Sequence, residues 1–150
     1  MKNNDISIRA FAPETDTLAL SRIWLDASLI AHAFIGEQRL LEQQRLIETQ
    51  YLPGAESWVA CIGDVPAGFI SLLDTFVGGI FVAPQRQGLG IGRKLITHAL
   101  NLKGELSLEV YTRNTGAMNF YASLGFEEVS RRASDDEGLP FENALLRLMK

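Results

Sequence analysis

The chain has 150 residues, of which 47% are hydrophobic and 21% charged, a balance typical of a folded domain rather than of a disordered segment. Its net charge of −4 gives no general attraction to nucleic acid, which we do not expect as a partner. The single cysteine, Cys61, excludes an intramolecular disulfide and a multi-cysteine metal site, so we expect no metal. No run is apolar enough for a signal peptide or a membrane span, and we expect a cytoplasmic protein without a membrane partner.

The first half of the chain predicts a strand, two helices and three further strands. Alternating residues 6–11 indicate the first strand, and Pro13 with Thr15 and Asp16 marks the start of a helix that continues to about residue 30. A second helix is expected from about residue 37 to 51, ended by Pro53 and Gly54. Segments 57–63 and 67–74 indicate a hairpin, and residues 78–84 a third strand after it.

The second half predicts a change of period. From Gly88, apolar residues recur at helical spacing until Gly104, and "ELSLEVY" at 105–111 then alternates as a strand does. A short helix over 115–125, a strand over 126–131, a turn over 134–140 and a last strand near 143–149 complete the order βααβββαβαββ. This order predicts a single α+β domain over residues 1–150, with a central mixed, mostly antiparallel sheet and helices on both faces.

The segment "VAPQRQGLGIGRKLI" at 82–96 places three glycines within five residues where a strand gives way to a helix. A Walker phosphate loop is excluded because no Ser or Thr follows Lys94, and a Rossmann fingerprint is disfavoured by the spacing of the glycines and by the antiparallel strands before them. The remaining interpretations are a diphosphate bound by backbone amides at a helix N-terminus, or a glycine-rich turn without a ligand.

Two motifs in the chain resemble the GCN5-related N-acetyltransferase (GNAT) superfamily, and in particular its small bacterial members. The acyl-CoA motif Gln/Arg-x-x-Gly-x-Gly/Ala is matched by Gln87, Gly90 and Gly92, and a second register begins at Gln85. We prefer the first register because it places the last glycine at the helix start. The block "LEVYTRNTGAMNFYASLGF" is similar to a second family motif, with matches at Asn114, Ala117, Phe120, Tyr121, Gly125 and Phe126.

The resemblance implies the GNAT-type acyl-CoA N-acyltransferase fold and acetyl-CoA as co-substrate, with strands 78–84 and 105–111 splayed to admit its pantetheine arm. It further implies direct transfer of the acetyl group to an amine in a ternary complex. The backbone groups implied to pair with pantetheine belong to Ile80, Phe81 and Val82. The amides implied to hold the diphosphate are those of Gln87, Gly88, Leu89, Gly90, Ile91 and Gly92, and the other cofactor-side residues are Arg93, Asn114, Ala117 and Phe120.

Direct transfer needs a proton donor for the leaving thiolate and an acceptor for the proton of the amine. Tyr121 matches the tyrosine that serves as donor in the family; a core position is the alternative for it. Two carboxylates compete for the role of base: Glu109, which matches a glutamate base of some family members, and Asp74, which ends the strand before the CoA strand.

The acceptor side is expected near the loop after the first helix. His32, Phe34 and Tyr111 are the candidate substrate-binding residues, with plain packing as the alternative for each. Trp24 is expected in the core and His98 on the surface.

The favoured acceptor is a protein lysine or an N-terminal amine, and a small amine is the alternative acceptor. The alternative function is a CoA-binding module without turnover. The partners expected are acetyl-CoA and the acceptor, for a monomer or a homodimer.

Overall fold

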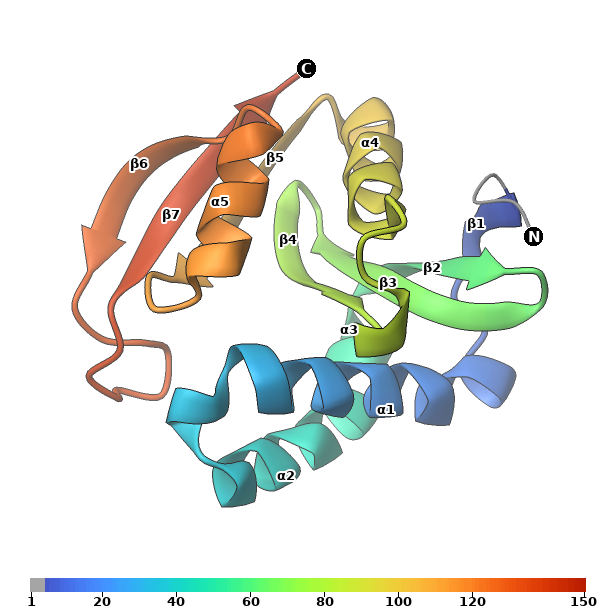
Figure 1. Cartoon of the computed structure of the whole chain (residues 1–150), viewed down its shortest axis with the longest axis horizontal. Helices are drawn as coiled ribbons and strands as arrows, with labels where there is room; N and C mark the ends of the chain where they lie inside the picture. Colours follow the sequence, from blue (N-terminus) through green and yellow to red (C-terminus); the bar gives the residue numbers. More distant parts are fainter. Residues whose placement is uncertain (1–4) are drawn as a thin grey trace.

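Seven strands form one mixed sheet in the order β1-β2-β3-β4-β5-β7-β6 (Figure 1). The computed structural model describes residues 5–150. Neighbouring strands are antiparallel except for β4 and β5, which run parallel. The strand bounds are Ile6–Ala10 (β1), Glu56–Ile62 (β2), Val65–Leu73 (β3), Phe76–Val82 (β4), Glu105–Tyr111 (β5), Glu127–Arg132 (β6) and Asn143–Met149 (β7). The predicted α+β class and the predicted order of elements are confirmed.

The helices lie on both faces of this sheet, as expected (Figure 1). Their bounds are Pro13–Ala31 (α1), Glu37–Leu46 (α2), Leu52–Gly54 (α3), Ile91–Lys103 (α4) and Thr115–Ser123 (α5), with a π-helical segment Ile47–Tyr51 between α2 and α3. The second predicted helix is therefore interrupted by a wider turn and extends through Pro53 instead of stopping before it. Among residues 5–150, no helix combines the length and the apolar character that a membrane crossing requires.

Two hydrophobic clusters fill the space between the sheet and its helices. One joins α4 and α5 to the sheet through residues such as Leu95 and Leu106, and the other joins α1 and α2 to β2 and β3 through residues such as Leu20 and Leu40. Trp24 belongs to the second cluster, as expected. These clusters hold both helical layers against the sheet and thereby fix the walls of the gap described next.

Strands β4 and β5 begin side by side and then separate. Only Phe76 and Val77 of β4 pair with β5. The register of β4 with β3 shifts immediately after these two pairs and leaves Gly78 as an extra residue. Such a bulge bends a strand and increases its twist, so that β4 turns away from β5. Residues 78–82 consequently have no strand partner on the side that faces β5, and the splay expected between these two strands is present.

The expectation that His98 lies on the surface is wrong. Its ring packs against Trp58 of β2, with the ring centroids 4.5 Å apart. Its Nε2 atom is buried and has no hydrogen-bond partner within the described part of the chain. The helical period alone placed His98 on the polar side of α4, and it could not show that a large side chain from the neighbouring strand covers that position.

Candidate active site

A cavity of about 740 Å³ occupies the gap between β4 and β5. Its volume lies within the range of small-molecule sites. The walls come from β4, the glycine segment, β5, the start of α5 and the end of α1. They include the predicted cofactor-side residues Ile80, Phe81, Val82, Gln87, Gly88, Gly90, Ile91, Gly92, Arg93, Asn114, Ala117 and Phe120. Leu89 is the exception, because its side chain packs on the hydrophobic cluster beside α4.

The glycine segment forms a cradle of backbone amides. Gly88 and Gly90 have φ angles of +83° and +86°, a region that favours glycine, and α4 begins directly after Gly90. The first hydrogen bond of α4 runs from the Lys94 amide to the Gly90 carbonyl at 3.1 Å. In the described chain, the amides of residues 88–93 donate to no protein acceptor. A run of free amides at the positive end of a helix fits an anion such as a diphosphate.

Tyr121 lies in the wall of the cavity and is buried. Its ring packs between Phe120 and Phe126, with centroid distances of 5.3 and 5.4 Å. Burial raises the pKa of the Tyr121 phenol, so the hydroxyl stays protonated at neutral pH. Among the described residues no side chain or backbone group bonds to this hydroxyl, which leaves it available as a proton donor toward the cavity.

His32 lines the cavity where α1 ends. Its Nε2 atom lies 3.3 Å from Nδ2 of Asn114, whose Oδ1 accepts a hydrogen bond from the Ala117 amide at 3.1 Å and so caps α5. Burial lowers the pKa of His32 to about 4. A neutral imidazole that is already engaged by Asn114 is a poor base, and its position favours a structural contribution to the cavity wall.

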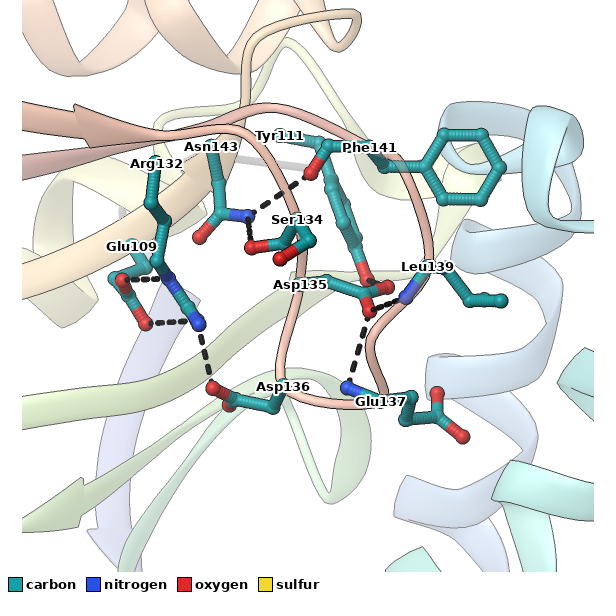
Figure 2. Close-up of polar contacts among 10 residues, drawn as sticks. All are labelled: Glu109, Tyr111, Arg132, Ser134, Asp135, Asp136, Glu137, Leu139, Phe141 and Asn143. Atoms are coloured by element: carbon teal, nitrogen blue, oxygen red, sulfur yellow. Dashed lines mark hydrogen bonds and ion pairs between the residues drawn. The ribbon is translucent and has the colours of Figure 1, made fainter.

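Tyr111 directs its ring and its hydroxyl to different partners. The ring lines the cavity, whereas the hydroxyl donates to Oδ2 of Asp135 at 3.0 Å (Figure 2). Burial, together with this bond to a carboxylate, raises the pKa of Tyr111. The other carboxylate oxygen of Asp135 accepts from the amides of Glu137 and Leu139 at 3.0 and 2.9 Å (Figure 2). Asp135 therefore ties the β6–β7 loop, residues 133–142, to the end of β5.

Four rings gather at the end of the cavity beside this loop, which we call the aromatic end: His32, Phe34, Tyr111 and Phe141. Phe34 is not part of the cavity wall, although it lies at a centroid distance of 5.3 Å from Tyr111 and 5.0 Å from Phe141. It thus packs against a residue of the wall, Tyr111, without lining the cavity itself. The β6–β7 loop also reaches α2, where Glu137 pairs with Arg39 at 2.9 Å and accepts from the Gln43 side chain.

The two candidate bases lie in very different surroundings. Glu109 lines the cavity, and both of its oxygens accept from Arg132 at 2.9 Å; Arg132 also contacts Asp136 at 2.6 Å (Figure 2). Asp74 is exposed in the turn between β3 and β4, at the end of β4 where the two strands are still paired. The structure therefore does not bring Asp74 to the cavity, because β4 carries the site at its opposite end.

Comparisons with known proteins agree with this arrangement. Residues 53–128 match the acetyltransferase (GNAT) domain model. The peptidyl-lysine N-acetyltransferase YjaB of Salmonella typhimurium is 35% identical over 123 residues, which cover 81% of this chain and 84% of that protein. This chain belongs to the GNAT acetyltransferase family. The peptidyl-lysine N-acetyltransferase YiaC of Escherichia coli is another GNAT relative, 32% identical over 130 residues that cover 86% of this chain and 89% of YiaC.

Solved structures show the same GNAT fold. The solution structure of apo YjaB from Escherichia coli has a TM-score of 0.86 and 34% identity, and the match covers 95% of this chain and 96% of that chain. The PaiA N-acetyltransferase of Thermoplasma acidophilum, solved with coenzyme A, has a TM-score of 0.80 over 97% of this chain and 99% of that chain. At 17% identity, this second likeness supports the fold alone.

This GNAT chain is an acetyl-CoA-dependent N-acetyltransferase, and its residues fit the co-substrate. The free amides of residues 88–93 suit the diphosphate, and the unpaired edge of β4 suits the amide groups of an extended pantetheine arm. Gly92 lets the start of α4 pack closely on the Phe120 ring, since a Cβ there would lie 3.0 Å from that ring. In the part of the chain that the structure describes, no group of His, Cys, Asp or Glu is placed to hold a metal ion.

Several residues of this GNAT site lie outside the sequence motifs. Asp135, Phe141 and Arg113 shape the aromatic end, and Arg132 holds Glu109, yet none of them belongs to a motif that we used. Local patterns could not reveal them, because Tyr111 and Asp135 are 24 residues apart and Arg39 and Glu137 are 98 residues apart. The one available signal was the acidic composition of the predicted turn, "SDDEG" at 134–138.

Proposed function

We propose that this GNAT enzyme acetylates protein amines, above all the side-chain amine of lysine. The observation that carries the proposal is the single cavity that connects the amide cradle of α4 with the aromatic end. Such a passage suits two substrates that enter from different sides and meet beside Tyr121. The relatives YjaB and YiaC, both named peptidyl-lysine N-acetyltransferases, support the choice of acceptor.

In this proposal each wall of the cavity has a task. Acetyl-CoA, when bound, supplies an activated thioester. The amides of residues 88–93 bind its diphosphate, and the free edge of β4 orients the arm that carries the thioester. A β4 amide beside the thioester oxygen stabilises the negative charge that develops there as the amine attacks. The amine attacks directly, so no side chain of this enzyme carries the acetyl group.

Proton transfers complete the reaction. Glu109 removes the proton of the attacking amine, directly or through water, and two hydrogen bonds from Arg132 orient this carboxylate. Tyr121 protonates the leaving thiolate, a task that its place in the cavity wall and its free hydroxyl support. His32 stays neutral and holds Asn114, which caps the helix that carries Tyr121. Glu109 accepts a proton and Tyr121 donates one, so these two side chains account for both proton transfers of the reaction.

The test is acetylation of defined amines followed by mass spectrometry. Peptides with one internal lysine and blocked ends are incubated with the enzyme and acetyl-CoA, beside matched peptides in which arginine replaces the lysine. Free amino acids and polyamines are assayed in parallel at equal concentration. We expect acetylation of the lysine peptides and no product from the arginine peptides. Turnover of the small amines alone would overturn the proposal and would make the enzyme a small-molecule acetyltransferase.

A further inference from the structure

Arg113 occupies an unusual position at the aromatic end. It lies in the turn between β5 and α5, and its guanidinium stands 5.7 Å from the ring centroid of Phe34 and 5.3 Å from that of Phe141. Both distances are within the range of cation–π contacts. Residue 113 is exposed, and among residues 5–150 its side chain makes no ion pair and no hydrogen bond. Two rings therefore hold a charged group in place while its donors stay free.

The acidic residues around Arg113 already have other partners. Arg132 binds Glu109 and Asp136, and Tyr111 binds Asp135. The remaining acids of the β6–β7 loop are Glu137, paired with Arg39, and Glu142, paired with Arg131 at 3.1 Å. Arg113 is thus the cation at this end of the cavity that no acid of the described chain neutralises. A carboxylate of a bound substrate could therefore form an ion pair with the Arg113 guanidinium.

We propose that Arg113 is a specificity-determining residue that binds an acidic side chain next to the acceptor lysine. The inference rests on the proposed function and names its preferred substrates: peptides in which aspartate or glutamate neighbours the lysine. Residues on either side of Arg113 support the geometry, since Asn114, next to it, and Tyr111, two residues before it, both line the cavity. A guanidinium offers a planar fork that matches a carboxylate, and prior contact with two rings reduces the entropy lost on binding.

The contact acts on binding rather than on chemistry. Arg113 is exposed beside Phe34 and Phe141 and, unlike Tyr121 and the glycines of the cradle, does not line the cavity. Its effect should therefore appear in the KM for the peptide and leave kcat and the Kd for acetyl-CoA unchanged. An exposed contact between one arginine and one carboxylate should change kcat/KM about fivefold.

The experiment measures kcat/KM for blocked peptides that differ only beside the lysine, with Glu, Gln or Arg in that position. Both ends are blocked, so that a free terminal carboxylate cannot substitute for the acidic side chain. For the wild-type enzyme we expect the Glu peptide to exceed the Gln peptide about fivefold and the Arg peptide to be the poorest substrate. Arg113→Gln should make the Glu and Gln peptides equal, and Arg113→Glu should favour the Arg peptide.

Arg22→Gln is the matched control, because Arg22 is exposed on α1 and outside the cavity wall, and the same charge change there should keep the wild-type preference. Arg113→Lys serves as a second variant that retains the charge and loses the planar fork; it should weaken the preference without reversing it. Equal kcat/KM for the Glu and Gln peptides with the wild-type enzyme, or a preference that survives Arg113→Gln, would overturn the inference alone. No acetylation of any lysine peptide would overturn the proposed function and this inference with it.

Discussion

Asn114 donates a hydrogen bond from Nδ2 to Nε2 of His32, at 3.3 Å, and this bond joins the end of α1 to the first turn of α5. The oxygen of the same amide accepts from Ala117, so the nitrogen must face the imidazole. Nε2 of His32 is consequently the acceptor, and the ring carries its single proton on Nδ1. Protonation of the ring would break this contact.

A loss of stability in acid follows from this bond. The pKa of His32 falls from 6.5 to about 4 on folding. Between pH 6.5 and pH 4, His32 is therefore protonated in the unfolded chain and neutral in the folded chain. The resulting stabilisation is complete above pH 6.5 and is lost as the pH falls toward 4, by about 2 kcal/mol between pH 7.5 and 5. Urea unfolding of the wild type and of His32→Gln at both pH values measures this difference. An equal loss in both proteins would contradict the prediction.

Gly90→Ala should lower both stability and acetyl-CoA affinity. Its φ angle of +86° strains any residue with a side chain, and relief of the strain would turn the free amides of the cradle apart. Gly104→Ala is the matched control, because Gly104 ends the same helix at φ +83° and faces open space. Both variants should lose about 1 kcal/mol of unfolding free energy, and only Gly90→Ala should bind acetyl-CoA more weakly in calorimetry. Unchanged affinity in Gly90→Ala would remove the cradle from the binding site.

Tyr121→Phe should reduce kcat about 100-fold and leave the Kd for acetyl-CoA within a factor of two, because it removes a proton donor and no part of the cradle. Tyr51→Phe, at an exposed tyrosine outside the cavity, is its control. Since the pKa of Tyr121 is raised, its ionisation should not cause a fall in the wild-type rate below pH 10. Full activity of Tyr121→Phe in steady-state assays would assign the proton to another donor.

Glu109→Gln and Asp74→Asn separate the two candidate bases. Both replacements remove a carboxylate and keep its shape, but only Glu109 lines the cavity. We expect a fall in kcat of about 100-fold for Glu109→Gln and wild-type kcat for Asp74→Asn. The Kd for acetyl-CoA, measured by calorimetry, should stay constant in both. A full rate in Glu109→Gln would show that water alone accepts the proton.

Asp135→Ala should detach the β6–β7 loop from β5. It removes the partner of Tyr111 and of two backbone amides, and we expect a loss of about 2 kcal/mol or more. Hydrogen exchange at Glu137 and Leu139 should accelerate, and the KM for peptide acceptors should rise. Asp136→Ala is the control: its side chain is 87% exposed, and its pairing with Arg132 contributes little. Equal exchange in the two variants would argue against Asp135 as the anchor of the loop.

The order of elements and the position of the cradle could be predicted from the sequence because both depend on local patterns. Apolar spacing around Leu95, together with the glycines at 90 and 104, determines where α4 begins and ends. Local patterns could not predict that β7 lies between β5 and β6, nor that Glu109 pairs with Arg132. These features depend on contacts between segments that only the folded sheet brings together. The position of Asp74 outside the cavity could not be predicted for the same reason, since nearness in sequence to β4 does not show which end of that strand carries the site.

The short pairing of β4 with β5 has a consequence for the molecule as a whole. Four strands lie on one side of this seam and three on the other, and among residues 5–150 the strand pairing across it is limited to Phe76 with Ser107 and Val77 with Leu108. The two parts of the sheet are thus joined along a short seam, and the gap beyond it is where we propose that acetyl-CoA binds. A ligand that contacts both β4 and β5 would bridge the two strands where they form no backbone hydrogen bonds with each other. In the proposed complex, acetyl-CoA therefore links the two parts of the sheet where their strands do not pair.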